Sequence, residues 1–221
     1  MRKFIFFFIT AAFLLISQTG FGQQAVTSQR QPRVVDLGLS VKWADCNLGA
    51  STPEGYGDYY AWGETFTKSE YSLSTYKWCK GSNDTITKYC TDSEYGAVDN
   101  RIVLDLEDDV AQVKLGGKWR MPSAAEWDEL LEECEWIWTT QGGKNGYKVT
   151  SKINGKSIFL PAAGYRYNTS LGSAGSLGLY WSSSLSTSSP LSACFVYFGS
   201  DYYDWYYGGR YDGRSVRPVT E

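Results

Sequence analysis

The chain has 221 residues, of which 43% are apolar, 20% charged and 16% aromatic, a composition typical of a globular protein with a packed core. Its 21 basic and 24 acidic residues give a net charge of −3, so neither nucleic acid nor an anionic membrane surface is an expected partner. The sequence contains no histidine, which excludes histidine-dependent catalytic triads and metal sites built on imidazole.

The first 22 residues have the pattern of a secretory signal peptide. Arg2 and Lys3 precede an apolar run over residues 4–16, and residues 20–22 (Gly-Phe-Gly) offer a cleavage site. The run is too short to span a bilayer, and the nearest cysteine, Cys46, is too distant for a lipid anchor. We therefore expect an exported protein, in the periplasm, at the cell surface or secreted, without membrane insertion.

The remainder suits one domain preceded by a short leader. Residues 23–33 are polar and lack periodicity, which predicts a disordered leader, and residues 34–221 form the predicted domain. From Val35 to Trp43, apolar and polar residues alternate, which predicts a half-buried strand. Residues 47–63 are rich in Gly, Pro and Tyr, which predicts an ordered loop with a short strand around Tyr59–Trp62.

Five cysteines in an exported chain raise the question of disulfides, and their odd number leaves at least one unpaired. Cys79 and Cys90 bracket a polar loop, so they are the predicted disulfide pair. The alternative is that both are reduced and serve as small apolar residues. No CxxC motif accompanies them, which argues against a metal site.

An acidic run formed by Asp105, Glu107, Asp108 and Asp109 suggests calcium, because this cation prefers oxygen ligands. We favour a different interpretation, in which Asp105 caps a short helix that ends at Val113. The acidic residues then lie in its first turn, where the positive end of the helix dipole stabilises them. We therefore expect no metal and no cofactor, with calcium as the alternative.

One amphipathic helix is predicted from Ser123 to about Glu133. Ser123 and Glu126 form a capping box, and apolar residues then recur at helical spacing at Trp127, Leu130, Leu131 and Cys134. Aromatic and β-branched runs predict strands at 136–140, 147–153, 157–160, 180–184, 193–198 and 215–219, with a type I′ turn at Asn154-Gly155 and a loop over 168–178. The predicted fold class is α+β, with one main helix, twisted antiparallel strands and extensive ordered loops.

Six motifs together resemble one protein family. They are VDLGLSVKW (35–43), GDYYAWGE (57–64), GKWRMP (117–122), LPAAGYR (160–166), YWSSS (180–184) and SVRPV (215–219). In this combination and order the chain resembles the major paralogous domain proteins exported by Bacteroidetes and Fibrobacter, in the formylglycine-generating-enzyme-like branch of the C-type-lectin fold. The resemblance implies a C-type-lectin-like domain with a central helix and a C-terminal region that displays side chains. It implies no particular ligand, because this fold hosts enzymes, receptor-binding proteins and lectins.

Catalysis is not expected. The enzymes of the resembled branch use a cysteine pair near the C-terminus to bind copper, whereas here only Cys194 lies in the last 80 residues. A glycosidase would need two carboxylates, for which Glu64, Glu126 and Asp201 are candidates. Their spacing favours no pair, and Glu126 already belongs to the capping box, so no nucleophile and base can be assigned.

The C-terminal segment 197–211 has an unusual composition, because eight of its 15 residues are aromatic and most of the others are Gly, Ser and Asp. Tyrosine among small polar residues is typical of antibody-like binding surfaces. We expect Phe198 and Trp205 to be core anchors and the tyrosines of 202–207 to lie in a solvent-facing loop, because Gly and Asp favour turns. The alternative is that these tyrosines simply cover a β-rich surface. The predicted ligand-binding residues are Tyr202, Tyr203, Asp204, Tyr206, Tyr207, Tyr211 and Asp212. The stretch from 180–184 to 215–217 also resembles the cassettes that diversity-generating retroelements randomise.

The predicted function is that of a secreted, non-catalytic recognition module whose ligand is a glycan or a protein surface. One alternative is a structural protein of the cell envelope or surface whose tyrosines mediate self-association. The other is an enzyme of unrecognised mechanism. The oligomeric state stays open at this level.

Overall fold

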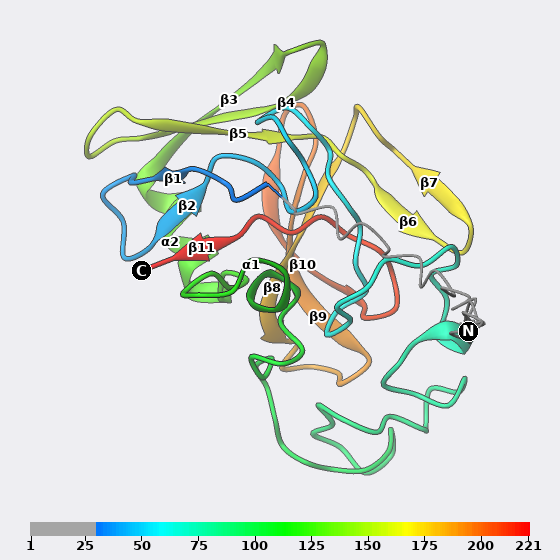
Figure 1. The fold of residues 1–221 in the computed structure, drawn as a ribbon. Helices are drawn as coiled ribbons and strands as arrows, with labels where there is room; N and C mark the ends of the chain where they lie inside the picture. Colours follow the sequence, from blue (N-terminus) through cyan, green and yellow to red (C-terminus); the bar gives the residue numbers. More distant parts are fainter. Residues whose placement is uncertain (1–29) are drawn as a thin grey trace, which may run out of the picture.

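Antiparallel sheets make up most of the regular structure of residues 30–221, which are the residues that the computed structural model describes (Figure 1). The β3–β5 sheet lies at one end of the molecule, long loops in the first half of the chain lie at the other, and the β8–β10 sheet lies between them. Few helices are present, so the structure fits a small α+β or mostly-β fold. The predicted signal peptide, residues 1–22, lies outside the described residues.

A small sheet joins the two ends of the described chain, in the order β1 (Val34–Val35), β2 (Lys42–Ala44) and β11 (Val219–Thr220). The prediction of one continuous strand over 35–43 is wrong, because the chain turns back between β1 and β2. Asp36 Oδ1 accepts the Gly38 N–H at 2.8 Å, and Gly38 has a φ of +77°, which favours glycine. Apolar residues at alternate positions of this segment are nevertheless buried, as predicted: Leu37, Val41 and Trp43.

The first helices are short. A 3-10 turn, η1, covers Leu73–Thr75, and α1 covers Val110–Leu115. Asp109 caps α1, because its Oδ1 accepts the N–H groups of Ala111 at 2.9 Å and Gln112 at 3.1 Å. The prediction that Asp105 caps this helix is therefore wrong by one helical turn.

The main helix, α2, covers Ala124–Glu133 and confirms the predicted capping box. The Ser123 side chain accepts the Glu126 N–H, and the Glu126 side chain accepts the Ser123 N–H. Trp127 is fully buried, with its ring centroid 4.8 Å from that of Trp43, and its indole N–H donates to the Trp181 carbonyl at 3.3 Å. The helix therefore anchors both the N-terminal sheet and β8.

The second sheet has the order β3 (Cys134–Gln141), β4 (Lys144–Ser151) and β5 (Ser157–Pro161), which confirms the three strands predicted here. The turn between β4 and β5 has a positive φ at Gly155 but not at Asn154. It is therefore not the predicted type I′ turn, which requires a positive φ at both central residues.

The third sheet has the order β10-β9-β8, with β8 at Gly178–Leu185, β9 at Ser192–Phe198 and β10 at Tyr203–Gly209. Strands β8 and β9 were predicted, whereas the description of 202–207 as loop is wrong. The strand β10 forms because β9 pairs with all seven of its residues. A further hairpin, β6 (Tyr165–Tyr167) and β7 (Ser170–Gly172), lies partly within the segment predicted as a loop.

Two other predicted strands are shorter than expected. Within 59–62, only Tyr60 forms a β-bridge, and its partner is Arg214. Within 215–219, only the last residue belongs to a strand, β11, while Ser215 makes an isolated bridge to β8. Both segments lie alongside the β8–β10 sheet without joining it as full strands.

The two faces of the β8–β10 sheet cover two apolar clusters. One contains Trp43, Trp127, Tyr180 and Phe198, and the other contains Trp62, Tyr89, Trp181 and Phe195. Because side chains alternate along a strand, β8 and β9 contribute to both clusters. The sheet is therefore the central layer of the molecule.

All five cysteines are free thiols, so the predicted disulfide between Cys79 and Cys90 is not formed in this structure. The Cys79 thiol donates to the Leu73 carbonyl at 3.0 Å, and the Cys90 thiol donates to the Asp92 carbonyl at 3.1 Å. Each sulfur therefore has its own local partner.

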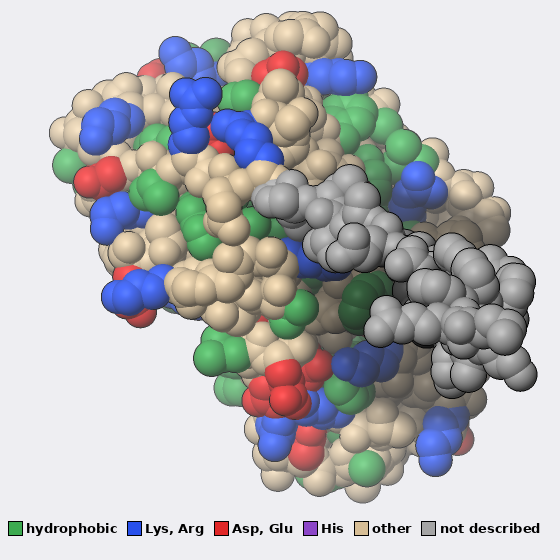
Figure 2. Space-filling model, viewed as in Figure 1, with side chains coloured by type: hydrophobic (Ala, Val, Ile, Leu, Met, Phe, Trp, Pro, Cys, Tyr) green, Lys and Arg blue, Asp and Glu red, His purple; other side chains and the backbone are tan. Residues whose placement is uncertain are grey.

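The described chain begins with residues that contact the domain, since the Arg33 N–H donates to Asp45 at 2.8 Å. None of the helices in residues 30–221 has the length and apolar character needed to cross a membrane. On the face seen in Figure 2, basic side chains gather in the region of β3–β5, and acidic and basic side chains lie together over the loops at the opposite end. The net negative charge is thus not concentrated in one acidic patch on this face.

Candidate functional site

The β8–β10 sheet separates the predicted ligand-binding tyrosines onto two faces. Tyr203, Trp205 and Tyr207 project toward α2, whereas Asp204 and Tyr206 project to the opposite face, because side chains alternate along β10. The Trp205 indole N–H donates to Asp128 on α2, which fixes the orientation of the first face. Tyr206 is 61% exposed and Tyr207 is 49% exposed, so each face displays an accessible tyrosine.

On the α2 face, Tyr203 has a packing role. Its ring stacks on Trp136 of β3, with centroids 4.9 Å apart and an interplanar angle of 22°. The edge of Tyr147 also lies against it, with centroids 5.7 Å apart. Such aromatic pairs stabilise the fold beyond the area that they bury. Tyr203 therefore joins the β3–β5 sheet to the β9–β10 hairpin.

The other face contains a pocket of about 410 Å³, lined by the sheet, the β6–β7 region and the segment that follows β10. Four aromatic rings form its walls, two charged side chains meet in it, and three smaller side chains complete it. The residues are Tyr165, Phe195, Tyr197, Tyr206, Asp212, Arg214, Ser173, Leu177 and Leu179.

Arg214 is held rigidly in this pocket. Its guanidinium carbon lies 4.1 Å from the Trp181 ring centroid and 3.9 Å from that of Phe195, and its Nη2 donates to Asp212 Oδ2 at 2.9 Å. A Cβ atom on Gly208 would lie 2.5 Å from Arg214 Nη2. Gly208 therefore lets the guanidinium pass directly beneath β10.

Two buried polar atoms of this pair have no hydrogen-bond partner among residues 30–221, namely Asp212 Oδ1 and Arg214 Nε. Burial raises the pKa of Asp212 although Arg214 opposes the shift, and burial lowers the pKa of Arg214 to about 10. Burying polar groups is costly unless they find partners. Both atoms are themselves buried, so they remain unpaired beneath the pocket surface.

The aromatic surface continues beyond the pocket. The Tyr202 hydroxyl donates to the Tyr197 hydroxyl at 2.7 Å, and their ring centroids are 5.3 Å apart. The Tyr197 and Tyr206 centroids are 6.1 Å apart. Tyr197, Tyr202 and Tyr206 therefore form one continuous aromatic rim, and we call this rim and the pocket the aromatic pocket site.

The structure thus divides the seven predicted residues. Tyr206 and Asp212 line the pocket and Tyr202 belongs to its rim, whereas Tyr203 and Tyr207 lie on the opposite face. The two remaining residues lie outside the pocket: Asp204 accepts the Trp205 N–H at 2.7 Å, and Tyr211 packs against a cluster that contains Tyr59 and Tyr71.

Sequence reasoning missed three important parts of this site, Tyr165, Phe195 and Arg214. Each lies within or beside a segment that the sequence singled out for another reason. The alternation in 193–198 already placed Phe195 and Tyr197 on one face of a strand, and this signal was available. Nothing in the sequence indicated that Arg214 lies beneath β10.

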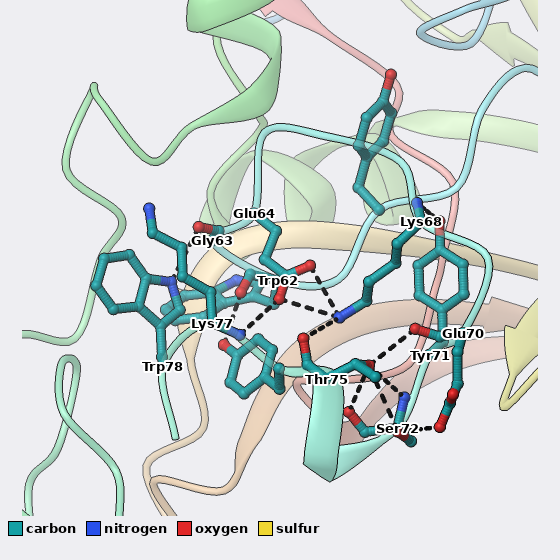
Figure 3. Close-up of polar contacts among 12 residues, drawn as sticks. Trp62, Gly63, Glu64, Lys68, Glu70, Tyr71, Ser72, Thr75, Lys77 and Trp78 are labelled. Atoms are coloured by element: carbon teal, nitrogen blue, oxygen red, sulfur yellow. Dashed lines mark hydrogen bonds and ion pairs between the residues drawn. The ribbon is translucent and has the colours of Figure 1, made fainter. Parts of the chain in front are cut away.

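A second hollow, of about 280 Å³, lies beside the loop that follows Trp62, and its lining includes Glu64, Lys68 and Lys77. Figure 3 shows the Lys68 side chain extending between Glu64 and Thr75. Lys68 Nζ lies 2.9 Å from Glu64 Oε2, and the Lys77 N–H donates to Glu64 Oε1 at 2.7 Å. Glu64 therefore holds two segments of loop together.

The other carboxylates considered for catalysis also have local partners. Glu126 accepts hydrogen bonds from Arg120 Nη1 at 2.7 Å and from the Ser123 N–H at 2.8 Å. Asp201 accepts a hydrogen bond from Ser200 in the turn before β10. Each of these two carboxylates therefore has a local structural contact in its own segment.

The acidic run considered for calcium surrounds a lysine. Carboxylate oxygens of Asp105, Glu107 and Asp108 lie close together, and Lys88 Nζ lies 2.7, 3.3 and 2.6 Å from them respectively. Burial would raise the pKa of Asp108, but hydrogen bonds from Lys88, Tyr89 and Lys77 outweigh it and lower the pKa. The ammonium group of Lys88 takes the place that a metal cation would need.

No protein-family model, curated protein or solved structure matches the chain.

Proposed function

We propose that this protein is a non-catalytic recognition module that binds a glycan in the aromatic pocket site. The observation that supports the proposal is the combination of four aromatic walls with the charged Asp212–Arg214 pair in the lining of the same pocket. Aromatic rings can pack against the apolar faces of sugar rings. Charged oxygen and nitrogen atoms form strong hydrogen bonds with hydroxyl groups.

The shape of the site favours a glycan over a protein surface. A pocket of about 410 Å³ lies within the range of sites for small ligands, roughly 300–1,000 Å³, whereas protein interfaces are extended. The charged groups lie inside the pocket rather than around an exposed patch, since the Arg214 side chain is only 5% exposed. A protein ligand would have to insert a side chain to reach them.

We further propose the C-type-lectin-like fold and the major paralogous domain family for this chain, with export directed by residues 1–22. The support is the set of motifs in the sequence, together with the short antiparallel strands, the single main helix and the long loops. The tyrosine-rich β10 corresponds to the C-terminal display region that the resemblance implies.

The alternative functions make different use of the same residues. A structural envelope protein would assemble through its exposed tyrosines without any ligand, and light scattering over a concentration series would show masses that keep increasing. An enzyme would require a nucleophile and a base, and no pair of the carboxylates considered above supports that role.

An array of glycans and proteins tests the proposal when it is probed with residues 23–221 and with two single variants. Tyr206 and Tyr207 are neighbours in β10 with similar exposure, but only Tyr206 lines the pocket. We expect the wild-type chain to bind a glycan, Tyr206→Ala to lose about tenfold or more in affinity, and Tyr207→Ala to bind like the wild type. Binding to proteins alone, or equal loss in both variants, would contradict the proposal.

A further inference from the structure

The strand β10 forms an open edge of the central sheet. Among residues 30–221, β9 is its only strand partner, whereas the outer side of β8 is covered by hydrogen bonds to Ser215, Pro122 and Ile102. Proteins usually protect such an edge with lysine, proline or a bulge. The sequence of β10, Tyr-Asp-Trp-Tyr-Tyr-Gly-Gly, contains none of these and carries a single charge, at Asp204.

The ladder with β9 determines which backbone groups face outward. The Gly199 N–H donates to the Tyr202 carbonyl at one end of the hairpin, and the Arg210 N–H donates to the Leu191 carbonyl at the other. Hydrogen-bonded residues alternate in an antiparallel ladder. The backbone N–H and C=O groups of the even-numbered residues therefore point toward β9, and those of the odd-numbered residues of 203–209 point outward, away from the sheet. The Trp205 N–H agrees with this assignment, because it donates to the Asp204 side chain instead of β9.

This edge is complementary to itself. If two copies pair antiparallel with Tyr206 on the two-fold axis, every residue of β10 has a partner and the outward-facing residues meet as pairs in hydrogen-bonding register. The Trp205 N–H and the Gly209 carbonyl, which have side-chain partners within the chain, would exchange them for the second copy. Trp205 then lies opposite Tyr207 of the second copy, which makes an aromatic cross-strand pair twice. Tyr203 lies opposite Gly209, where the Tyr211 ring occupies the position of the missing side chain, so Tyr203 meets a third aromatic ring there.

The charges fit the same register. Asp204 lies opposite Gly208 of the second copy, and the guanidinium of Arg214 occupies the space where a Gly208 side chain would lie. The single negative charge of each edge thus approaches a positive charge of the other copy. No like charges face each other along the strand.

We propose that two copies of this chain form a closed dimer through β10, with Tyr206 at the two-fold axis and the β8–β10 sheets joined into one sheet of six strands. Antiparallel pairing places the axis perpendicular to the sheet, so both aromatic pocket sites lie on the same face. A surface that carries repeated glycans would then be bound by two sites at once. The dimer goes beyond the proposed function and does not depend on it.

A mass measurement by light scattering with size-exclusion chromatography tests the dimer. We expect the wild-type chain to have twice the monomer mass, and Asp204→Lys to raise the dissociation constant about tenfold or more, because it places a lysine over Arg214. The control is Asp201→Lys, which makes the same charge change in the exposed turn before β10 and should leave the mass unchanged. A monomer at all concentrations, species larger than two copies, or equal behaviour of the two variants would overturn the proposal.

Cysteine cross-linking tests the register independently. A residue on the axis in a non-hydrogen-bonded pair has a Cα–Cα distance of about 4.5 Å to its own copy, which suits a disulfide. We expect mild oxidation to link Tyr206→Cys into a covalent dimer and to leave Tyr202→Cys, outside the strand, unlinked. Failure of Tyr206→Cys to link, or equal linkage of both, would overturn the register. Glycan binding by a monomeric protein would reject the dimer and support the proposed function.

Discussion

Gly208 lies where β10 passes over the Arg214 guanidinium, and the close approach depends on the missing side chain. We predict that Gly208→Ala destabilises the protein by about 1–3 kcal/mol, because the new Cβ would lie 2.5 Å from Arg214 Nη2 and 3.0 Å from Phe195 Cε1. The Arg214 side chain cannot move aside easily, since it is held between two aromatic rings. Chemical denaturation measures the change.

The matched control is Gly172→Ala in β7, where an added Cβ would have its nearest contact at an ordinary 3.5 Å, to Tyr165. We expect this variant to stay within about 0.5 kcal/mol of the wild type. A Gly208→Ala variant as stable as the control would show that Arg214 is not held beneath the strand.

The ion pair between Glu126 and Arg120 predicts a pH dependence. Burial would raise the pKa of Glu126, but hydrogen bonds from Arg120 and from the Ser123 N–H outweigh it, so the pKa lies below its ordinary value of 4.5. A carboxylate with a lowered pKa stabilises the folded state above its unfolded pKa and loses that effect as the pH falls through its folded pKa. We therefore expect the wild type to have a higher melting temperature than Glu126→Gln at pH 7. The difference between the two melting temperatures should shrink below about pH 4.5.

Thermal melting at several pH values measures this difference. The control is Glu132→Gln, on an exposed position of the same helix, which should melt like the wild type across the range. A difference between wild type and Glu126→Gln that stays constant with pH would contradict the assignment.

At the scale of elements, α2 is the support for the central sheet. We predict that Trp127→Ala lowers the free energy of unfolding by about 3–5 kcal/mol, since Trp127 is fully buried against Trp43 and Tyr180 and donates a hydrogen bond to β8. Phe66→Ala is the control, because Phe66 is 72% exposed and should cost about 0.5 kcal/mol or less. Similar melting of the two variants would mean that α2 is not packed as described.

The elements that could be predicted from the sequence are those with local causes. The capping box and the apolar spacing that begins at Trp127 lie within one helix, so they predicted α2 correctly. The alternation of apolar and polar residues over 35–43 also matches the observed burial of alternate side chains. Such alternation, however, cannot distinguish a strand from a turn that buries alternate residues. Here Asp36 and Gly38 reverse the chain.

The strand β10 could not be predicted, because its cause is not local. Asp and Gly favour turns, and only the pairing of 203–209 with β9 makes the segment extended. The same pairing decides which tyrosines enter the pocket. Composition therefore drew attention to Tyr202, Tyr206 and Asp212, which belong to the aromatic pocket site, but without the register it could not separate them from Tyr203 and Tyr207.

At the scale of the whole molecule, the aromatic pocket site forms where three separate segments meet, 165–179, 195–206 and 212–214. The sheet that carries it is supported on both faces by apolar clusters, so the site is built on a rigid layer. The site therefore depends on tertiary structure throughout, although most of its side chains are conspicuous in the sequence.

The most direct test of glycan recognition is an NMR titration of the chain with ring-labelled tyrosine, using the glycan that gives the strongest array signal. We expect the resonances of Tyr165, Tyr197 and Tyr206 to shift in proportion to the bound fraction. Tyr207, on the opposite face of β10, and Tyr95, which does not line the pocket, should not shift. Shifts confined to Tyr207, or binding without any change at Tyr165, Tyr197 and Tyr206, would contradict the central claim that this pocket recognises the sugar.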